Sequence, residues 1–214
     1  MKLKVLELFA GTRSIGKAFE EKGHEVYSVE WDKQHENINL YADIATVTSQ
    51  QILEEFGKPD IIWASPDCTT YSIAAISTHR HREGDGHLSP KSDKAKQSDA
   101  VNQHVLELIK ELNPKYYFIE NPRGGMRKMR WIQDIQRYTV TYCQYGDTRM
   151  KPTDIWTNHP NPKFKPMCKN GQPCHVAAPR GSKTGTQGLK GSVLRSKIPR
   201  ELCEHIVTIS EELI

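Results

Sequence analysis

The sequence contains no long hydrophobic run. None of its apolar stretches approaches the roughly 20 residues that a membrane-spanning helix needs, so we expect no membrane partner. The first residues, MKLKVLE, hold no apolar signal-peptide stretch before the first acid. The five cysteines are few and odd in number, which argues against a disulfide framework and predicts a reducing, cytoplasmic location. The 12 prolines and 14 glycines are ordinary for a globular protein and exclude collagen-like and disordered classes.

Acidic residues are scarce in one part of the chain. Residues 121–200 hold 16 Lys and Arg but only 3 Asp and Glu, which gives this block a net charge of +13. The rest of the chain holds 14 Lys and Arg and 23 Asp and Glu, a net charge of −9, and the two blocks sum to the overall charge of +4. A basic block of this size indicates a polyanionic partner, most commonly nucleic acid. The alternative is a solvated basic face without a partner.

Strand-like and helix-like segments alternate over the first 145 residues. We expect strands at residues 3–9, 25–31, 60–65, 116–120 and 139–145, and helices at 14–22 and 48–57. A further helix would begin at Ser98 and end at Asn113-Pro114. Strands separated by single helices form βαβ units, so the sequence predicts an α/β fold with a mixed, mostly parallel sheet.

Two segments depart from this alternation. Residues 73–97 are polar and without periodicity, which predicts either a mobile functional loop or disorder. Residues 158–196 are basic and irregular, and Pro199 opens a last helix with apolar residues at 202, 206, 209 and 213. We therefore expect a catalytic domain at 1–157, a small basic recognition segment at 158–196, and a C-terminal helix at 197–214 that returns to the catalytic domain.

Ligands of parallel α/β sheets bind beyond the carboxyl ends of the strands. After the first predicted strand, Gly11 allows a ligand to approach the backbone closely. Glu30 follows the second strand, where a carboxylate can accept hydrogen bonds from both hydroxyls of a ribose. Trp31 offers a flat face for a purine, and Asp43 can accept from an adenine amino group. Together these residues predict an adenosine pocket.

Two further strand ends carry reactive side chains. Cys68 follows the strand at 60–65 and is a candidate nucleophile, although lone cysteines are more often small buried hydrophobes. Glu120 ends the strand at 116–120 and is followed by Asn121 and Pro122. Shielding from water would raise the pKa of the Glu120 carboxyl and allow it to act as an acid.

These motifs resemble, in order, those of the DNA cytosine-5 methyltransferase family. The matching segments are Phe9-Ala10-Gly11, Glu30-Trp31-Asp32, residues 66–72 (PDCTTYS), Glu120-Asn121-Pro122, residues 144–151 (QYGDTRMK) and the closing residues 198–202 (IPREL). The last segment looks like that of compact, phage-type members. Three positions depart from the family pattern: Thr12-Arg13 in the glycine turn, Asp67 where a proline usually precedes the cysteine, and Pro122 in place of the more usual valine.

The resemblance implies a Rossmann-like fold and transfer of a methyl group from S-adenosylmethionine to C5 of cytosine in DNA. Cys68 would add to C6 of a flipped base, Glu120 would protonate N3, and Arg149 would help to hold the base. It implies cofactor contacts at Phe9, Ala10, Gly11, Thr12, Glu30, Trp31, Asp43, Ile44 and Pro66. We expect DNA contacts at Ser72, Arg80, Arg82, Lys151, Lys163, Lys165, Arg180 and Lys183.

The resemblance also suggests a setting. We expect a monomer that acts on double-stranded DNA in the cytoplasm of a bacterium or a phage-infected host, with a role in restriction-modification or phage genome modification. Two alternatives remain open. One is cytosine-5 methylation of RNA, or C5 alkylation with a modified cofactor. The other is an inactive relative that only binds nucleic acid, which would follow if Asp67 disabled Cys68.

The basic segment also contains Cys168, Cys174 and His175. With His159 or another cysteine as the fourth ligand, these residues could hold Zn²⁺. The spacing matches no common zinc finger, and adjacent cysteine and histidine ligands are awkward for one tetrahedron. We therefore expect no metal and keep zinc as the alternative.

Overall fold

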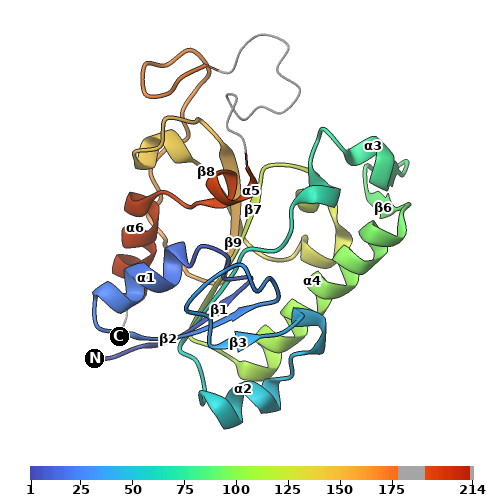
Figure 1. Cartoon of the computed structure of the whole chain (residues 1–214). Helices are drawn as coiled ribbons and strands as arrows, with labels where there is room; N and C mark the ends of the chain where they lie inside the picture. The colour runs from blue at the N-terminus through green and yellow to red at the C-terminus, as the bar shows by residue number, and fades with distance from the viewer. Residues whose placement is uncertain (178–190, 213–214) are drawn as a thin grey trace.

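The computed structural model describes residues 1–177 and 191–212. Its centre is a seven-stranded sheet with the strand order β3-β2-β1-β4-β7-β9-β8 (Figure 1). The first five strands of that order are parallel, and β9 runs antiparallel to both β7 and β8. The predicted mixed, mostly parallel α/β sheet is thus confirmed. Its strands are β1 (Lys4–Leu8), β2 (Glu25–Glu30), β3 (Leu40–Tyr41), β4 (Ile61–Ala64), β7 (Tyr116–Pro122), β8 (Arg137–Thr141) and β9 (Pro152–Thr157).

Helices cover both faces of the sheet (Figure 1). Helices α1 (Ser14–Glu21) and α6 (Arg200–Glu211) pack against each other on one face, and α2 (Ser49–Glu55) and α4 (Asp93–Leu112) lie on the other. Successive side chains of a strand point to opposite faces, so Val5 of β1 joins the core under α1 and α6, whereas Leu6 joins the core under α2 and α4. The short helices are α3 (Ile76–His79), α5 (Ser192–Ser196), η1 (Ile44–Thr46), η2 (Thr69–Tyr71), η3 (Gly125–Lys128), η4 (Arg130–Ile132) and η5 (Tyr142–Tyr145).

The polar segment at 73–97 folds into regular elements, which corrects the alternative of disorder, while a functional role as a mobile loop stays a prediction. It forms α3, the hairpin of β5 (Arg80–Arg82) and β6 (Leu88–Pro90), and the first turn of α4. The guanidinium of Arg80 is buried and makes a bidentate ion pair with Asp99 of α4, at 2.8 and 3.0 Å. Its Nε donates to the Thr70 carbonyl at 2.9 Å. A buried tertiary ion pair therefore orders a segment that has no hydrophobic periodicity of its own.

Three local predictions differ from the structure. Helix α4 is capped by Ser92, whose hydroxyl accepts from the Ala95 N–H, so it begins at Asp93, five residues before Ser98. The strand predicted at 139–145 ends at Thr141 and gives way to η5. Strand β9 was not predicted, because its buried residues include the polar Thr153 and Asp154 and its sequence lacks the alternation of apolar and polar residues. Residues 158–177 contain neither helix nor strand, as the irregular composition predicted, whereas Ser192–Ser196 of the same predicted segment form the short helix α5.

Across the part of the chain that the structure describes, no helix has the length and apolar character to cross a membrane.

Candidate active site

The turn between β1 and α1 has an unusual backbone. Phe9, Gly11 and Arg13 all lie in the left-handed region, with φ angles of 56°, 48° and 56°. Such conformations are costly for residues other than glycine and concentrate at ligand-binding turns. This turn contains the predicted cofactor residues Phe9, Ala10, Gly11 and Thr12.

The carboxylate of Glu30 joins this turn to the end of β2. Its Oε2 accepts a hydrogen bond from the Gly11 N–H at 2.9 Å, and its Oε1 accepts from the N–H groups of Trp31 and Asp32 at 2.9 and 3.0 Å. The next side chain, Trp31, is 68% exposed. A large indole left in solvent beside a buried carboxylate fits the adenosine half of S-adenosylmethionine, because the acid can bind vicinal hydroxyls and the ring can stack on a purine.

The other predicted cofactor residues lie around the same strand ends. Asp43 caps η1 by accepting from the Ala45 N–H at 3.0 Å, and Ile44 is buried beside it. Pro66 is buried after β4. A cleft of 510 Å³ opens next to the β1–α1 turn, and of the predicted residues Gly11 and Thr12 line it. Sequence reasoning missed the cleft's other walls, which are formed by one side of α1, by residues 34–37, by Lys197 and Ile198, and by Arg200 and Cys203 of α6.

Cys68 follows β4, and Glu120 lies near the end of the adjacent parallel strand β7. Ala64 of β4 pairs with Ile119 of β7, so the chain leaves both strands at the same edge of the sheet. The half-buried Cys68 comes four residues after β4, and Glu120 is buried near the end of β7. The negative charge of Glu120 raises the pKa of the Cys68 thiol, so the two groups lie within electrostatic reach of each other. The structure thus brings together the two residues that the sequence singled out.

The environment of Glu120 favours its protonated form. Burial raises the pKa of the Glu120 carboxyl, and this effect outweighs the lowering by Lys151 and by hydrogen bonds from Tyr142 and Ser65. The Tyr142 hydroxyl donates to Oε1 at 3.0 Å.

The pKa of the Cys68 thiol is also raised. Burial is the largest cause, followed by the negative charges of Asp67 and Glu120, whereas Lys151 lowers it. Asp67 has a structural role as well, since its Oδ1 accepts from the N–H and hydroxyl of Thr69 at 3.0 and 2.6 Å. These bonds hold the turn that follows Cys68.

Lys151, rather than Arg149, is the cation that faces this pair. Strand β9 runs antiparallel to β7, so Lys151, which precedes β9, lies near the end of β7. Its ammonium sits 4.4 Å from the centre of the Tyr142 ring and interacts with Glu120 and Cys68. Arg149, predicted to hold the base, instead forms a buried ion pair with Asp147 and donates to the Arg195 carbonyl at 3.2 Å.

The predicted DNA contacts fall into several groups. Arg80 is buried against Asp99 and is not available to a phosphate, so its assignment is corrected. Lys163 and Lys165 form ion pairs at 2.9 Å with Glu212 and Glu201, which reduces their free charge. Arg82 is exposed and Ser72 partly so. Arg180 and Lys183 lie outside the described residues.

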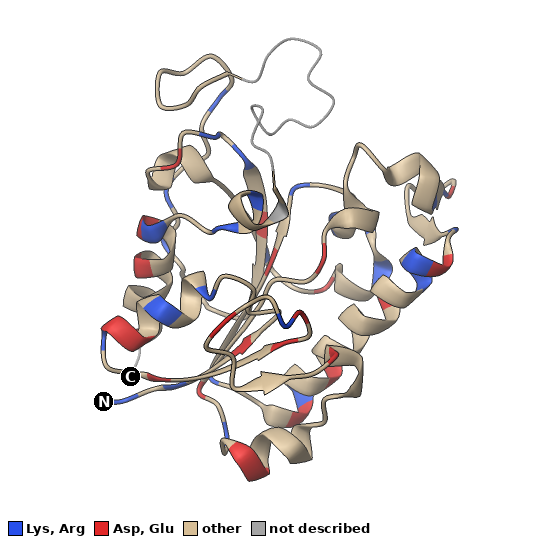
Figure 2. Ribbon diagram, viewed as in Figure 1, with Lys and Arg blue, Asp and Glu red and all other residues tan. Residues whose placement is uncertain are grey.

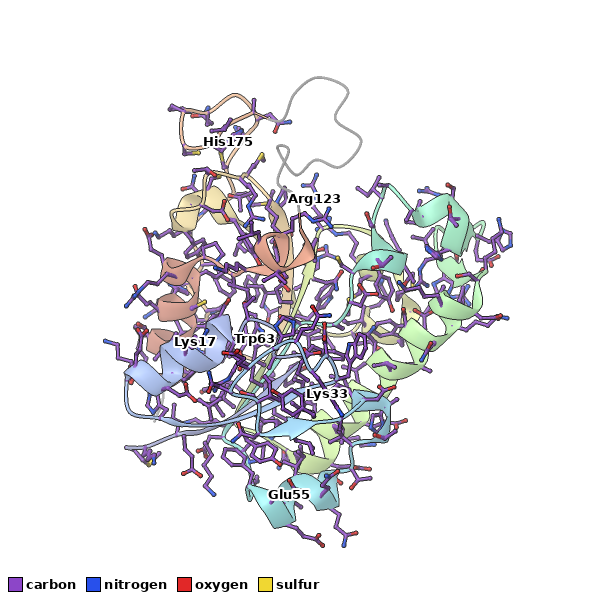
Figure 3. All side chains as sticks on the ribbon, viewed as in Figure 1. Lys17, Lys33, Glu55, Trp63, Arg123 and His175 are labelled. Carbon is purple, nitrogen blue, oxygen red and sulfur yellow. The ribbon has the colours of Figure 1, made fainter. Side chains whose placement is uncertain are left out.

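Two exposed side chains near the pair were missed by sequence reasoning. Arg123 directly follows β7 and projects near the edge of the sheet where that strand ends (Figure 3). Ile73 is 73% exposed on the turn after Cys68. The signal for both was their position, three residues after Glu120 for Arg123 and five residues after Cys68 for Ile73. Figure 2 shows further Lys and Arg around α5 and the loops above β7 and β9.

Comparisons with known proteins place this chain in a family. Residues 3–136 match the family model of C-5 cytosine-specific DNA methylases. A protein of Frog virus 3 (isolate Goorha), named probable DNA (cytosine-5)-methyltransferase, is 30% identical over 213 residues, covering 92% of this chain and 95% of the relative.

A solved methyltransferase structure shows the same fold. The Entamoeba histolytica methyltransferase EhMeth superposes with a TM-score of 0.52 at 13% identity, over 73% of this chain and 52% of that chain. The S. pombe Dnmt2 methyltransferase has a TM-score of 0.49 at 14% identity, over 73% of this chain and 49% of that chain. The chain therefore spans about half the length of these solved methyltransferases. The expectations of a Rossmann-like methyltransferase fold and of S-adenosylmethionine as cofactor are confirmed. The chain belongs to the C-5 cytosine-specific DNA methylase family of enzymes.

Proposed function

We propose that this chain methylates C5 of cytosine in double-stranded DNA by covalent addition of Cys68 to C6 of a base flipped out of the duplex. The convergence of Cys68, Glu120 and Lys151 at the neighbouring ends of β4, β7 and β9 carries the proposal. S-adenosylmethionine, when bound, supplies an electrophilic methyl group. Glu30 and Trp31, with the β1–α1 turn, would hold its adenosine portion.

The residues at the strand ends suit each step of this chemistry. Cytosine C5 is a poor nucleophile until the Cys68 sulfur bonds to C6 and the electrons of the C5–C6 double bond move toward C5. Protonated Glu120 stabilises the electron-rich ring by donating to N3. After methyl transfer to C5, loss of the C5 proton returns electrons to the ring and expels Cys68 as a thiolate. Lys151 stabilises the negative charge of the sulfur before addition and after expulsion.

A DNA substrate needs a surface around this site. A target atom inside the duplex is inaccessible, so the base must be extruded at a cost of a few kcal/mol. We assign phosphate contacts to Arg123 and Arg82. Lys151 lies at the Cys68–Glu120 pair, so we place its DNA contact at the flipped base rather than at a phosphate. We place the exposed Ile73 next to the gap that the flipped base leaves. Arg149 is kept as a positioning residue, because its ion pair with Asp147 shapes the turn that presents Lys151.

A methyl-transfer assay separates this proposal from its alternatives. The full chain is incubated with S-adenosylmethionine labelled in the methyl group and with duplex DNA, single-stranded DNA or RNA of matched sequence, with Cys68→Ser as control. We expect label in 5-methylcytosine of duplex DNA and none with the control. Label in RNA alone would establish the RNA alternative, and no label in any substrate would support an inactive binding relative.

A further inference from the structure

Four metal-ligand side chains meet at the base of the basic segment. Within the described ranges, the candidate ligand atoms of Cys143, Cys168, Cys174 and His175 all lie within 4.8 Å of one another. Cys143 belongs to η5, whereas the other three residues come from the irregular chain after β9. Figure 3 shows His175 at that end of the molecule, well away from Trp63 in the sheet. The fourth ligand is therefore a cysteine 25 residues upstream of Cys168, which no local spacing reveals.

The separations that involve Cys143 and His175 are those of a tetrahedral site, whereas the sulfurs of Cys168 and Cys174 lie closer together. Sγ of Cys174 lies 3.7 Å from Sγ of Cys143 and 3.0 Å from Sγ of Cys168. Nδ1 of His175 lies 3.4 Å from the Cys168 sulfur and 3.7 Å from the Cys174 sulfur. Around zinc, with Zn–S near 2.3 Å and Zn–N near 2.0 Å, a tetrahedron places neighbouring sulfurs about 3.8 Å apart and sulfur and nitrogen about 3.5 Å apart.

Backbone hydrogen bonds hold the irregular segment against η5 independently of these side chains. The N–H of Lys165 donates to the Tyr145 hydroxyl, and the N–H of Cys168 donates to the Thr141 hydroxyl, both at 2.9 Å. The N–H of Val176 donates to the Thr148 carbonyl at 2.9 Å. Hydrogen bonds thus hold the segment on both sides of the three ligand residues, so the fold itself brings the ligands together.

We propose that Cys143, Cys168, Cys174 and His175 bind one structural Zn²⁺ ion. Three thiolates and one imidazole are soft, four in number and all from the protein, which is the donor set of closed structural zinc sites. Binding would release the thiol protons and leave a site of net charge −1. His159 is not part of it, since its Nε2 donates to the Ile209 carbonyl at 3.1 Å.

The ion would join the basic segment to the catalytic domain. Cys143 directly follows Tyr142, whose hydroxyl donates to Glu120, so zinc would fix η5 on one side and the segment's path on the other.

The rival chemistry is a disulfide between Cys168 and Cys174. Their sulfurs are 3.0 Å apart, beyond the bonded distance of about 2.05 Å, and both are free thiols in the structure. The inference does not depend on the proposed function.

The test is the metal content of the purified full-length chain, produced without a histidine tag in zinc-supplemented medium. We expect one zinc per chain by mass spectrometry, and about a tenfold or greater loss in Cys174→Ser and in His175→Ala. Cys68→Ser and His81→Ala are matched controls outside the cluster and should retain zinc. Because Cys174 is exposed, its substitution should leave the fold intact, and far-ultraviolet circular dichroism checks this.

Cobalt provides a second measurement that does not depend on the variants. Replacing zinc with Co²⁺ in the wild-type chain should give the visible d–d bands of a tetrahedral site and a thiolate-to-cobalt charge-transfer band. The proposal would be overturned if the wild-type protein held little zinc or if Cys174→Ser retained it. An octahedral cobalt spectrum would overturn it as well, and so would a Cys168–Cys174 disulfide found by mass spectrometry.

Discussion

The side-chain amide of Asn121 donates a hydrogen bond to the Pro66 carbonyl at 3.0 Å, across 55 residues of sequence. This bond joins the strand that carries Glu120 to the loop that carries Cys68, and both partners are buried. Asn121 therefore sets the position of the thiol relative to the acid, so that the two groups reach one bound base together.

Removal of this bond should impair the chemistry more than binding. We expect Asn121→Ala to lower kcat by about 10- to 100-fold with a smaller change in KM, since misplacement of reacting groups costs rate. It should also destabilise the chain by roughly 1–3 kcal/mol, because the Pro66 carbonyl loses its buried donor. Steady-state kinetics and urea unfolding measure the two effects. An Asn121→Ala enzyme with wild-type kcat would contradict this positioning role.

Substitution of Lys151 should raise the pKa of Cys68. The ammonium lowers the pKa values of both Cys68 and Glu120, so Lys151→Gln should shift the Cys68 titration to higher pH. At a fixed pH below that titration, alkylation of Cys68 by iodoacetamide should slow, on the order of tenfold for a shift of one unit.

Lys151→Arg is the matched control, because it keeps the charge and should keep the wild-type pH profile. Peptide-resolved mass spectrometry follows Cys68 separately from the other four cysteines. A pH profile unchanged in Lys151→Gln would show that the ammonium does not act on the thiol.

Removal of the Asp67 charge should have the opposite effect. Asp67 raises the pKa of Cys68, so Asp67→Asn should move the same alkylation profile to lower pH and speed the reaction several-fold at neutral pH. Asparagine retains an Oδ1 that accepts from Thr69, so the turn after Cys68 is preserved. Slower alkylation in Asp67→Asn would refute the electrostatic reading of this departure from the family pattern.

A buried carboxylate beneath α1 makes stability depend on pH. Glu7 accepts from the Gly16 N–H at 2.8 Å and lies 3.8 Å from the Arg13 guanidinium. Burial nevertheless raises its pKa from 4.5 to about 7. The folded chain therefore keeps a proton that the unfolded chain releases above pH 4.5, and the free energy of unfolding falls as pH rises from 4.5 to 7.

Glu7→Gln should lose that dependence. Subtracting its unfolding free energy from that of the wild type cancels the other titrations, and the difference should change by about 3 kcal/mol between pH 4.5 and 7.5. Urea titrations at several pH values measure it. A difference that stays flat across this range would show that Glu7 ionises in the fold as it does in water.

The sequence was most informative where local pattern and packing agree. The strands β1, β2, β4 and β7 lie within about two residues of their predicted bounds because each is a short apolar run between turn signals. The same strands place Cys68 and Glu120, so the candidate pair could be predicted from the chain alone. Thr48 also caps α2 through the Gln51 N–H, as the capping pattern indicated.

Features that depend on distant partners could not be predicted. Arg80 resembles a surface residue in the sequence, but Asp99 neutralises it in the interior and orders the hairpin. Buried Asp154 of β9 pairs with Arg127, which conceals the strand from any hydrophobic pattern. Cys143 joins Cys168 only through the fold. The division into three segments, the monomeric state and the phage or restriction setting stay predictions.

The central claim is that Cys68 bonds to an extruded cytosine, and trapping on 5-fluorocytosine tests it most directly. With S-adenosylmethionine and duplex DNA containing this base, the fluorine at C5 cannot leave as a proton does, so the adduct cannot resolve. We predict a stable protein–DNA complex whose cross-linked peptide contains Cys68, and no complex with Cys68→Ser. A cross-link at another residue, or one that survives Cys68→Ser, would contradict the account.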